Sequence, residues 1–120
     1  MKRLSVSSLL ILFLLSSSLV LAQVKIQTNK FSANTSTSGY TLDKNSGDRS
    51  VTIEVTFEKP FDKKPTVILN VTTLDADTKS NTRYSVEPTS ISRDGFTIKI
   101  STWSESKIFG IGGNWIAYSD

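Results

Sequence analysis

The sequence predicts an all-β fold, an antiparallel sandwich or barrel of five or six short strands in one domain. Apolar and polar residues alternate along several short segments, which is the pattern of half-buried strands. Clusters of Gly, Pro, Asn, Asp and Ser separate these segments at fairly regular intervals. No window of the sequence has convincing helical periodicity.

The N-terminal segment predicts a secretory signal peptide over residues 1–22. It begins with two basic residues and continues with the apolar run Leu9–Leu15. Val20 and Ala22 are small enough for the −3 and −1 positions of a cleavage site. The apolar run is too short to cross a bilayer. We therefore expect cleavage and secretion, rather than an uncleaved anchor helix or insertion into the membrane.

The remaining chain is expected to form a polar N-terminal arm with a first strand over residues 23–48 and the sandwich over residues 49–120. It has no cysteine and no histidine, so a disulfide is excluded and a zinc site nearly so. A small domain without these staples is often stabilised by oligomerisation. Outside the signal, 12 basic residues face 11 acidic ones with no basic run, so nucleic-acid binding is not expected.

The first expected elements are weak. Residues 24–26 can form a short edge strand, and a loose arm follows that carries the glycosylation sequon Asn34-Thr35-Ser36. Residues 43–48 form a turn cluster by their chemistry. From Arg49 the alternation is clear, with the inward series Val51, Ile53, Val55 and Phe57.

The next elements lie between proline-marked loops. Pro60 and Pro65 bracket a loop in which Phe61 is expected to plug the end of the core. Residues 66–74 predict a strand that is apolar on both faces and so covered on both, with a second sequon at Asn70. Residues 83–87 predict a strand with Tyr84 and Val86 inward, and the clean pattern ends at Pro88.

Two strands complete the chain. After a tight turn at residues 93–95, the inward series is Phe96, Ile98 and Ile100. Residues 108–117 predict the last strand, and its inward face is expected to hold Phe109, Ile111, Gly113 and Trp115. The glycines of residues 110–113 indicate that another backbone or a ligand approaches closely.

The sequence gives little support for catalysis or metal binding. Hydrolysis needs a nucleophile with a base or two facing carboxylates, and no such set is evident. Asp43, Asp48, Asp75 and Asp77 could be read as calcium ligands, but they are scattered and form no EF-hand pattern. We expect no enzyme activity, no metal and no cofactor.

Two residues on the outward side of their strands are the best functional candidates. Trp103 has the parity of Lys99 and Ser101, so its indole should form an exposed stacking platform for the C–H face of a sugar. A bulge that turns Trp103 inward, or a subunit interface, would also fit. Arg83 also points outward, and its planar fork can bind two oxygens, although a surface ion pair is the simpler reading.

Taken in order, several short pieces from Val55 to Ala117 resemble the H-type lectin domain, found in snail agglutinins and in the C-terminal part of discoidins. The pieces are VTFEKPF (55–61), TVILNVTTLDAD (66–77), Asn81-Thr82-Arg83, Asp94-Gly95-Phe96, Ser101-Thr102-Trp103, Lys107-Ile108-Phe109 and Asn114-Trp115-Ile116. The resemblance implies a six-stranded antiparallel β-sandwich that assembles into trimers or hexamers. It also implies calcium-independent binding of terminal N-acetylgalactosamine or galactose between neighbouring protomers.

The resemblance also implies the site residues. Arg83 corresponds to the arginine that binds sugar hydroxyls, and Trp103 to the tryptophan of the family's Thr-Trp motif. An aspartate precedes the Val51 strand in the family; Asp48 is the choice here, with Asp43 or Asn45 as alternatives. Ser104 stands where some members have His, and Phe109 where a Tyr is common.

These observations predict a secreted lectin that binds glycans through several sites at once. The alternative is a non-catalytic cell-adhesion or structural sandwich module that binds protein. Ser104 and Phe109 slightly favour that alternative and weaken the preference for galactosamine, since Ser104 replaces the His of some members and Phe109 lacks the hydroxyl of the common Tyr.

Overall fold

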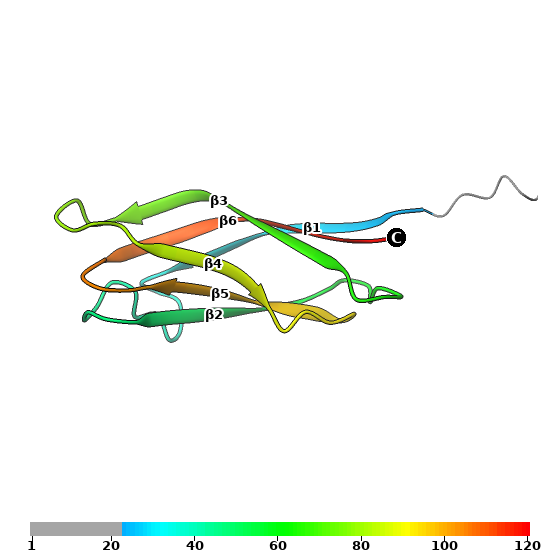
Figure 1. Ribbon diagram of the computed structural model, residues 1–120, viewed down its shortest axis with the longest axis horizontal. Helices are drawn as coiled ribbons and strands as arrows, with labels where there is room; N and C mark the ends of the chain where they lie inside the picture. The colour runs from blue at the N-terminus through cyan, green and yellow to red at the C-terminus, as the bar shows by residue number, and fades with distance from the viewer. Residues whose placement is uncertain (1–22) are drawn as a thin grey trace, which may run out of the picture.

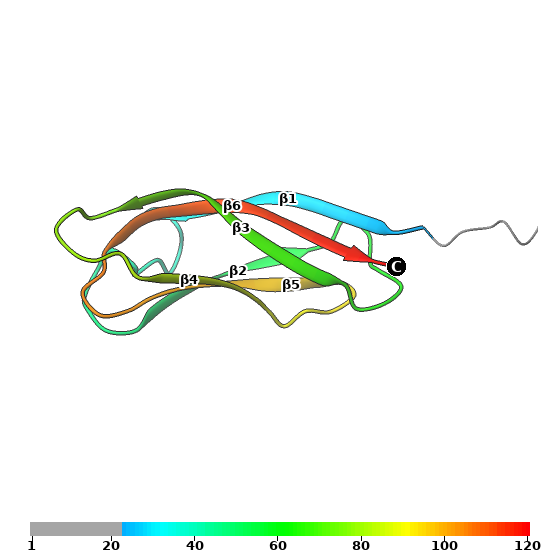
Figure 2. The same ribbon diagram turned by 45° about the horizontal axis from the view of Figure 1, so that its top comes forward.

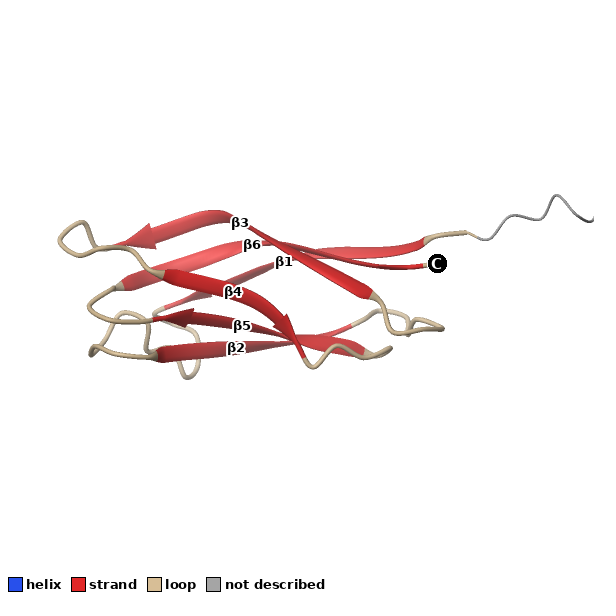
Figure 3. Ribbon diagram, viewed as in Figure 1, coloured by secondary structure: helices blue, strands red, loops and turns tan. Residues whose placement is uncertain are grey.

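The computed structural model describes residues 23–120, so the signal peptide predicted over residues 1–22 lies outside the described residues. The described chain forms six strands and no helix (Figures 1 and 3). The strands are β1 (Lys25–Asn34), β2 (Arg49–Thr56), β3 (Thr66–Ala76), β4 (Tyr84–Thr89), β5 (Gly95–Thr102) and β6 (Ile108–Ser119).

The strands make two three-stranded antiparallel sheets that lie in two layers (Figures 1 and 2). The first sheet has the strand order β1-β6-β3, and the second sheet has the order β2-β5-β4. Only β4 and β5 follow one another within a sheet, so every other connection crosses from one layer to the other. The predicted six-stranded antiparallel β-sandwich is confirmed.

Strict alternation builds the core between the sheets. In the second sheet, Val51 lies opposite Ile100 and Ile53 lies opposite Ile98, so most of one face of the sheet is apolar. The first sheet and the loops supply the other side. The buried apolar residues are Phe31, Ala33, Tyr40, Leu42, Val51, Phe57, Phe61, Val67, Phe96, Ile98, Ile100, Ile108, Ile111, Trp115 and Ala117.

The short edge strand predicted at residues 24–26 extends to ten residues, through much of the segment predicted as a loose arm. β1 pairs with β6 from Lys25 to Asn34, and its Phe31 and Ala33 are buried. The sandwich therefore begins at β1 rather than at Arg49. The sequence shows little hydrophobic alternation over this strand, because it lies at the edge of the first sheet and buries only two of its ten side chains.

The start of β6 contains an irregularity that turns Phe109 outward. The ladder to β3 passes from Gly110 to Ile108 and leaves Phe109 as an extra residue. Ile108 is fully buried, whereas Phe109 is 39% exposed. The prediction that Phe109 shares an inward face with Ile111 is wrong, because a bulge shifts the alternation by one residue.

Strand β4 also differs from its prediction. Tyr84 was expected to point inward, but it is exposed at the end of the strand, opposite Thr102. Pro88 lies within the strand, opposite Ile98. An edge strand tolerates proline because one side of its backbone has no partner.

The predicted close approach of a backbone to the glycines of β6 occurs at Gly113. A β-carbon at this position would lie 1.8 Å from the carbonyl oxygen of Asn70. The β3–β6 ladder has a register shift between Val71 and Thr73, next to the pair of Val71 with Gly113. The two strands therefore lie very close together at this point. Any residue other than glycine would force the two strands apart.

The two ends of the sandwich are built differently. The loop end (left in Figure 1) gathers the connections 35–48, 77–83 and 103–107. The aromatic end, named for the cluster of Phe57, Phe61, Phe96 and Trp115, gathers the connections 57–65 and 90–94. Phe61 is 1% exposed, so its predicted role as a plug is confirmed.

Candidate functional site

Trp103 and Asp48 lie together at the loop end. A surface depression of about 300 Å³ lies over the ends of β2 and β5. Trp103 is 39% exposed, so the outward direction predicted from its parity is confirmed. The depression is lined by Asp48, Arg49, Ser50, Lys99, Ser101, Thr102 and Trp103.

The lining of this depression combines an aromatic surface with several polar groups. Asp48 brings a carboxylate and Lys99 an ammonium, and both side chains are exposed. Ser50 and Ser101 lie opposite each other in the β2–β5 ladder and add two hydroxyls. An indole beside hydrogen-bonding groups can hold a ligand that has one apolar and one hydroxylated side.

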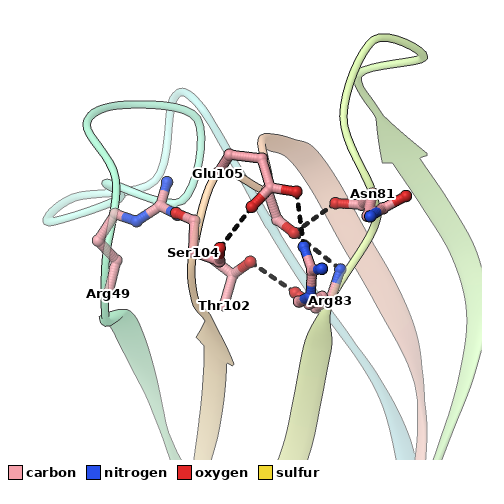
Figure 4. Close-up of polar contacts among 7 residues, drawn as sticks. Arg49, Asn81, Arg83, Thr102, Ser104 and Glu105 are labelled. Atoms are coloured by element: carbon pink, nitrogen blue, oxygen red, sulfur yellow. Dashed lines mark hydrogen bonds and ion pairs between the residues drawn. The ribbon is translucent and has the colours of Figure 1, made fainter.

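A second polar cluster lies between the start of β4 and the turn that follows β5 (Figure 4). The Nη1 atom of Arg83 donates a hydrogen bond of 2.7 Å to Oε1 of Glu105, and the Ser104 hydroxyl donates to the other carboxylate oxygen. Both bonds hold the pKa of Glu105 at about 2, with the Ser104 bond the larger cause. Glu105 is therefore ionised at neutral pH, and the Arg83 guanidinium keeps further donors for a ligand.

The backbone of Arg83 is held firmly. Its N–H donates to the hydroxyl of the buried Ser106 at 2.9 Å, and its carbonyl accepts a hydrogen bond from the buried Thr102 hydroxyl at 2.5 Å. The Ser106 hydroxyl in turn donates to the carbonyl of Asn81 (Figure 4). The start of β4 is thus fixed to the turn that follows β5.

Arg49 fixes the loop before β2 to the same turn. It is 8% exposed, and its Nη2 atom donates a hydrogen bond of 2.9 Å to the carbonyl of Ser104. Its Nε and Nη1 atoms donate to the carbonyls of Gly47 and Lys44 at 2.9 and 2.8 Å, and Nη1 also reaches that of Leu42 at 3.4 Å. Figure 4 shows its side chain extending from β2 toward Ser104.

All five predicted site residues lie at the loop end, and four of them gather in or beside the depression. Asp48 and Trp103 line the depression, and Arg83 and Ser104 share the Glu105 carboxylate beside it. Phe109 does not line the depression, because it belongs to the first sheet.

The two alternatives to Asp48 lie elsewhere in the loop. Asp43 is only partly exposed, and its charge contributes, after burial, to raising the pKa of Tyr40 to about 12. Asn45 has a positive φ of 60°, and its carbonyl accepts a hydrogen bond from Lys107. Neither residue lines the depression.

Sequence reasoning missed two residues of this end. Glu105 was not among the expected site residues, although it directly follows the candidates Trp103 and Ser104 in the sequence. Arg49 was read only as the start of a strand. Its inward direction could have been recognised from the alternation, because Arg49 continues the inward series of Val51 and Ile53. A charged residue that faces the core needs buried hydrogen-bond partners.

No potential metal site of three or more acidic side chains is found within residues 23–120. In the same part of the chain, no helix is long and apolar enough to cross a membrane. The chemistry that the loop end offers is hydrogen bonding, charge and aromatic stacking.

A small sandwich with an open, partly aromatic and partly polar depression at one end defines the class as a β-sandwich binding module. The model of the H-type lectin domain matches residues 52–118, which is more than half of the chain. The chain therefore belongs to the H-type lectin domain family, whose members are carbohydrate-binding and non-catalytic modules.

Similar proteins agree with this assignment. Over 77 residues the chain is 35% identical to one of the discoidin-1 chains of Dictyostelium discoideum, an alignment that covers 63% of this chain and 30% of the relative. Over 71 residues it is 32% identical to a Fuscovulum blasticum protein named ATP synthase subunits region ORF 7, covering 59% and 62%. The chain thus spans less than two thirds of the length of these relatives.

The fold has a solved counterpart. The structure of wild-type discoidin II from Dictyostelium discoideum superposes with a TM-score of 0.73 at 20% sequence identity. The match covers 82% of this chain and 37% of the discoidin chain. At this identity the likeness concerns the fold of the sandwich.

Proposed function

We propose that the protein is a secreted, calcium-independent lectin that binds glycans ending in N-acetylgalactosamine or galactose, and that Asp48, Arg83, Trp103 and Ser104 form its site. The observation that carries the proposal is the position of the Trp103 indole, half-exposed in one depression with the Asp48 carboxylate. The apolar C–H face of a sugar stacks on the indole, and its hydroxyls donate to the carboxylate.

Arg83 lies on the other side of Trp103 from Asp48, because the strand order is β2-β5-β4. The guanidinium donors that do not bind Glu105 could bind a second set of sugar oxygens, or the same sugar held between two protomers. The β4 strand is the edge of the second sheet, so a neighbouring protomer can approach Arg83 from that side. Family resemblance favours a sugar held between protomers.

Galactosamine preference is the weaker part of the proposal. Ser104 uses its hydroxyl on Glu105, and Phe109 offers no hydroxyl and stands outside the depression. A site with fewer fixed hydrogen bonds discriminates less between related sugars. We therefore expect galactose and N-acetylgalactosamine to bind with similar affinity.

Assembly into a homotrimer or hexamer is proposed from the outward face of the first sheet. Ile26 lies opposite Tyr118, and Ile68 lies opposite Ile116 in the ladders to β6, and all four side chains are exposed. Contiguous exposed apolar side chains of this kind often mark an interface, and identical chains usually close with cyclic symmetry. Light scattering of the secreted protein at micromolar concentration tests this, and a monomer mass refutes it.

The proposed function is tested on a glycan array. The oligomeric protein should bind glycans that end in N-acetylgalactosamine or galactose, and free N-acetylgalactosamine should compete. Binding should persist in a chelator, since no dense oxygen cage lies in the described loops. No glycan signal would refute the lectin function and favour a protein-binding module. Loss in chelator, restored by calcium, would refute calcium independence.

Export is tested separately. The intact mass of the protein recovered from the medium of expressing cells should correspond to a chain that begins at Gln23. A cell-associated protein of full-length mass would contradict the proposed signal cleavage.

A further inference from the structure

Arg49 is a buried cation that neutral groups hold in place. The ion pairs found within residues 23–120 are Lys25–Asp62 and Arg83–Glu105, so Arg49 has backbone carbonyls in place of a carboxylate. A buried charge is costly to maintain unless its donors are satisfied. An arginine held by four carbonyls at the rim of a binding depression therefore calls for an explanation.

The hydrogen bonds of Arg49 join two distant segments of the chain, since Ser104 lies 55 residues after Arg49. On one side are the carbonyls of the loop from Leu42 to Gly47, and on the other is the carbonyl of Ser104. The N–H of Gly47 also donates to the Ser104 carbonyl, at 2.9 Å. This joint, made of Gly47, Arg49 and Ser104, contains the two residues that flank Asp48 and the residue that follows Trp103.

We propose that Arg49 is a positioning residue of the glycan site. It holds the loop that carries Asp48 against the turn that carries Trp103, and so fixes the carboxylate beside the indole. The inference rests on the proposed function of the depression. It assigns Arg49 no contact with the sugar; the guanidinium acts through the placement of Asp48 and Trp103.

Lysine cannot replace arginine in this joint. Three different nitrogens of Arg49 donate in separate directions, to the loop on one side and to Ser104 on the other. A lysine ammonium is a single point of charge on a flexible stem and cannot bridge both segments at once. Arg49→Lys therefore keeps the charge but opens the joint between the loop and the turn.

The test compares Arg49→Lys with Arg93→Lys in the secreted protein. Arg93 is the control from the aromatic end: its Nε also donates to a loop carbonyl, that of Phe61, at 2.9 Å, although its side chain is exposed. Three quantities are measured: affinity for immobilised N-acetylgalactosamine, melting temperature, and hydrogen exchange of the amides of residues 43–48.

The positioning role predicts that Arg49→Lys weakens glycan binding by about tenfold or more, the loss expected when one charge-assisted hydrogen bond is misplaced. Exchange in residues 43–48 should become faster. The melting temperature should fall further than in Arg93→Lys, because Arg49 is buried and donates to four carbonyls, so affinity is compared well below both unfolding transitions. In Arg93→Lys, affinity and loop exchange should equal those of the wild type.

Several results overturn the inference. Unchanged affinity in Arg49→Lys does so, as does a fall in affinity that matches the fall in melting temperature in both variants. Unchanged exchange of residues 43–48 refutes the joint whatever the glycan result. A wild-type protein that binds no glycan refutes the proposed function instead, and the exchange data still decide whether Arg49 holds the loop.

A second pair of variants covers the case in which Arg49→Lys fails to fold. Gly47 has a φ of +83° and open space where a β-carbon would lie, so Gly47→Ala strains the joint and leaves Arg49 in place. Gly39 has a φ of +76° and the same open space but no bond to Ser104, so Gly39→Ala is its control. Weaker binding in Gly47→Ala alone supports the joint, and equal binding in the two variants refutes it.

Discussion

The two tryptophans show how the ends of the sandwich differ. Trp115 lies at the aromatic end, where it is 5% exposed and its ring centroid is 5.3 Å from that of Phe96 and 5.8 Å from that of Phe57. Trp103 lies at the loop end, where it is 39% exposed and has polar neighbours. The same side chain thus closes the core at one end and stays available to a ligand at the other.

The loops of the two ends are held in correspondingly different ways. At the aromatic end, Phe61 packs edge-on against Phe57 at 4.9 Å, so burial of apolar surface holds the loop together with a hydrogen bond from Arg93 to the Phe61 carbonyl. At the loop end, the segments are held by hydrogen bonds from Arg49, Thr102 and Ser106. Hydrogen bonds fix the loops around the depression without filling it with side chains, and this leaves room for a ligand.

The largest effect is expected when the aromatic end is broken. Phe61→Ala removes a fully buried ring and should destabilise the domain by about 3–5 kcal/mol, since transfer and cavity terms add. Urea unfolding followed by Trp fluorescence measures this. The loop-end counterpart is Trp103→Ala, which should cost clearly less than Phe61→Ala, because 39% of Trp103 is already exposed to solvent. Equal losses in the two variants would mean that Trp103 is structural.

The next effect concerns binding rather than stability. Arg83→Ala and Trp103→Ala should each weaken glycan binding by about tenfold to a hundredfold, which corresponds to roughly 1.5–3 kcal/mol. Titration against immobilised N-acetylgalactosamine measures the loss. Arg93→Ala, at the aromatic end, is the control and should bind like the wild type. Normal binding by Arg83→Ala would remove Arg83 from the site and leave the fold assignment intact.

The contrast between the ends also explains how much of the fold the sequence predicts. The strands β2 and β5 were found because strict alternation reflects their paired inward faces, as in Val51 opposite Ile100. The strand β1 was reduced to three residues, because its pairing with β6 is between distant parts of the chain and only Phe31 and Ala33 mark its inward face. Local pattern carries little information about an edge strand.

The positions of the proposed site residues were predictable where the alternation was regular. Parity gave the outward direction of Trp103 and of Arg83, and family resemblance gave Asp48 its place before β2. The predicted inward direction of Phe109 was wrong because one extra residue at the start of β6 inverts the alternation. Nothing in the local sequence marks this bulge. Arg49 was missed because its partners are backbone carbonyls, whose positions follow only from the folded loop.

A smaller effect is expected at Tyr40, a buried aromatic residue of the loop end. The buried Tyr40 hydroxyl donates to the Ile108 carbonyl at 2.6 Å. Tyr40→Phe should therefore cost about 1 kcal/mol at neutral pH, the value of one hydrogen bond. The exposed Tyr84, for which no side-chain hydrogen bond is found, is the control, and Tyr84→Phe should change stability little.

The cost of Tyr40→Phe should also depend on pH. Burial, helped by the charges of Asp43 and Asp75, raises the pKa of Tyr40 from 10.0 to about 12. Between these values the unfolded chain loses the proton and the folded chain keeps it, so the stability that Tyr40 contributes falls as pH rises from 10 to 12. Urea unfolding at about pH 8, 10 and 11.5 should show the two proteins converging, and a constant difference would contradict the shift.

The smallest effect separates the exposed ion pairs of the two ends. At the loop end, the Ser104 and Arg83 bonds hold the pKa of Glu105 at about 2; at the aromatic end, a hydrogen bond from Lys25 lowers the pKa of Asp62. Ser104→Ala should raise the Glu105 pKa toward its ordinary value of 4.5, and more than Arg83→Ala does, because the Ser104 bond is the larger cause. Carbon NMR of the side-chain carboxyls during acid titration measures both.

The direction of the accompanying stability change follows from the sign of the shift. A lowered pKa contributes stability above pH 4.5 that is lost as pH falls through about 2, so Ser104→Ala and the wild type should converge in strong acid. The difference at neutral pH should be small, because both partners of the pair are exposed to solvent. Asp62 should titrate alike in both proteins. A Glu105 titration unchanged in Ser104→Ala would show that the Ser104 hydroxyl is free in solution, and thus available to a sugar.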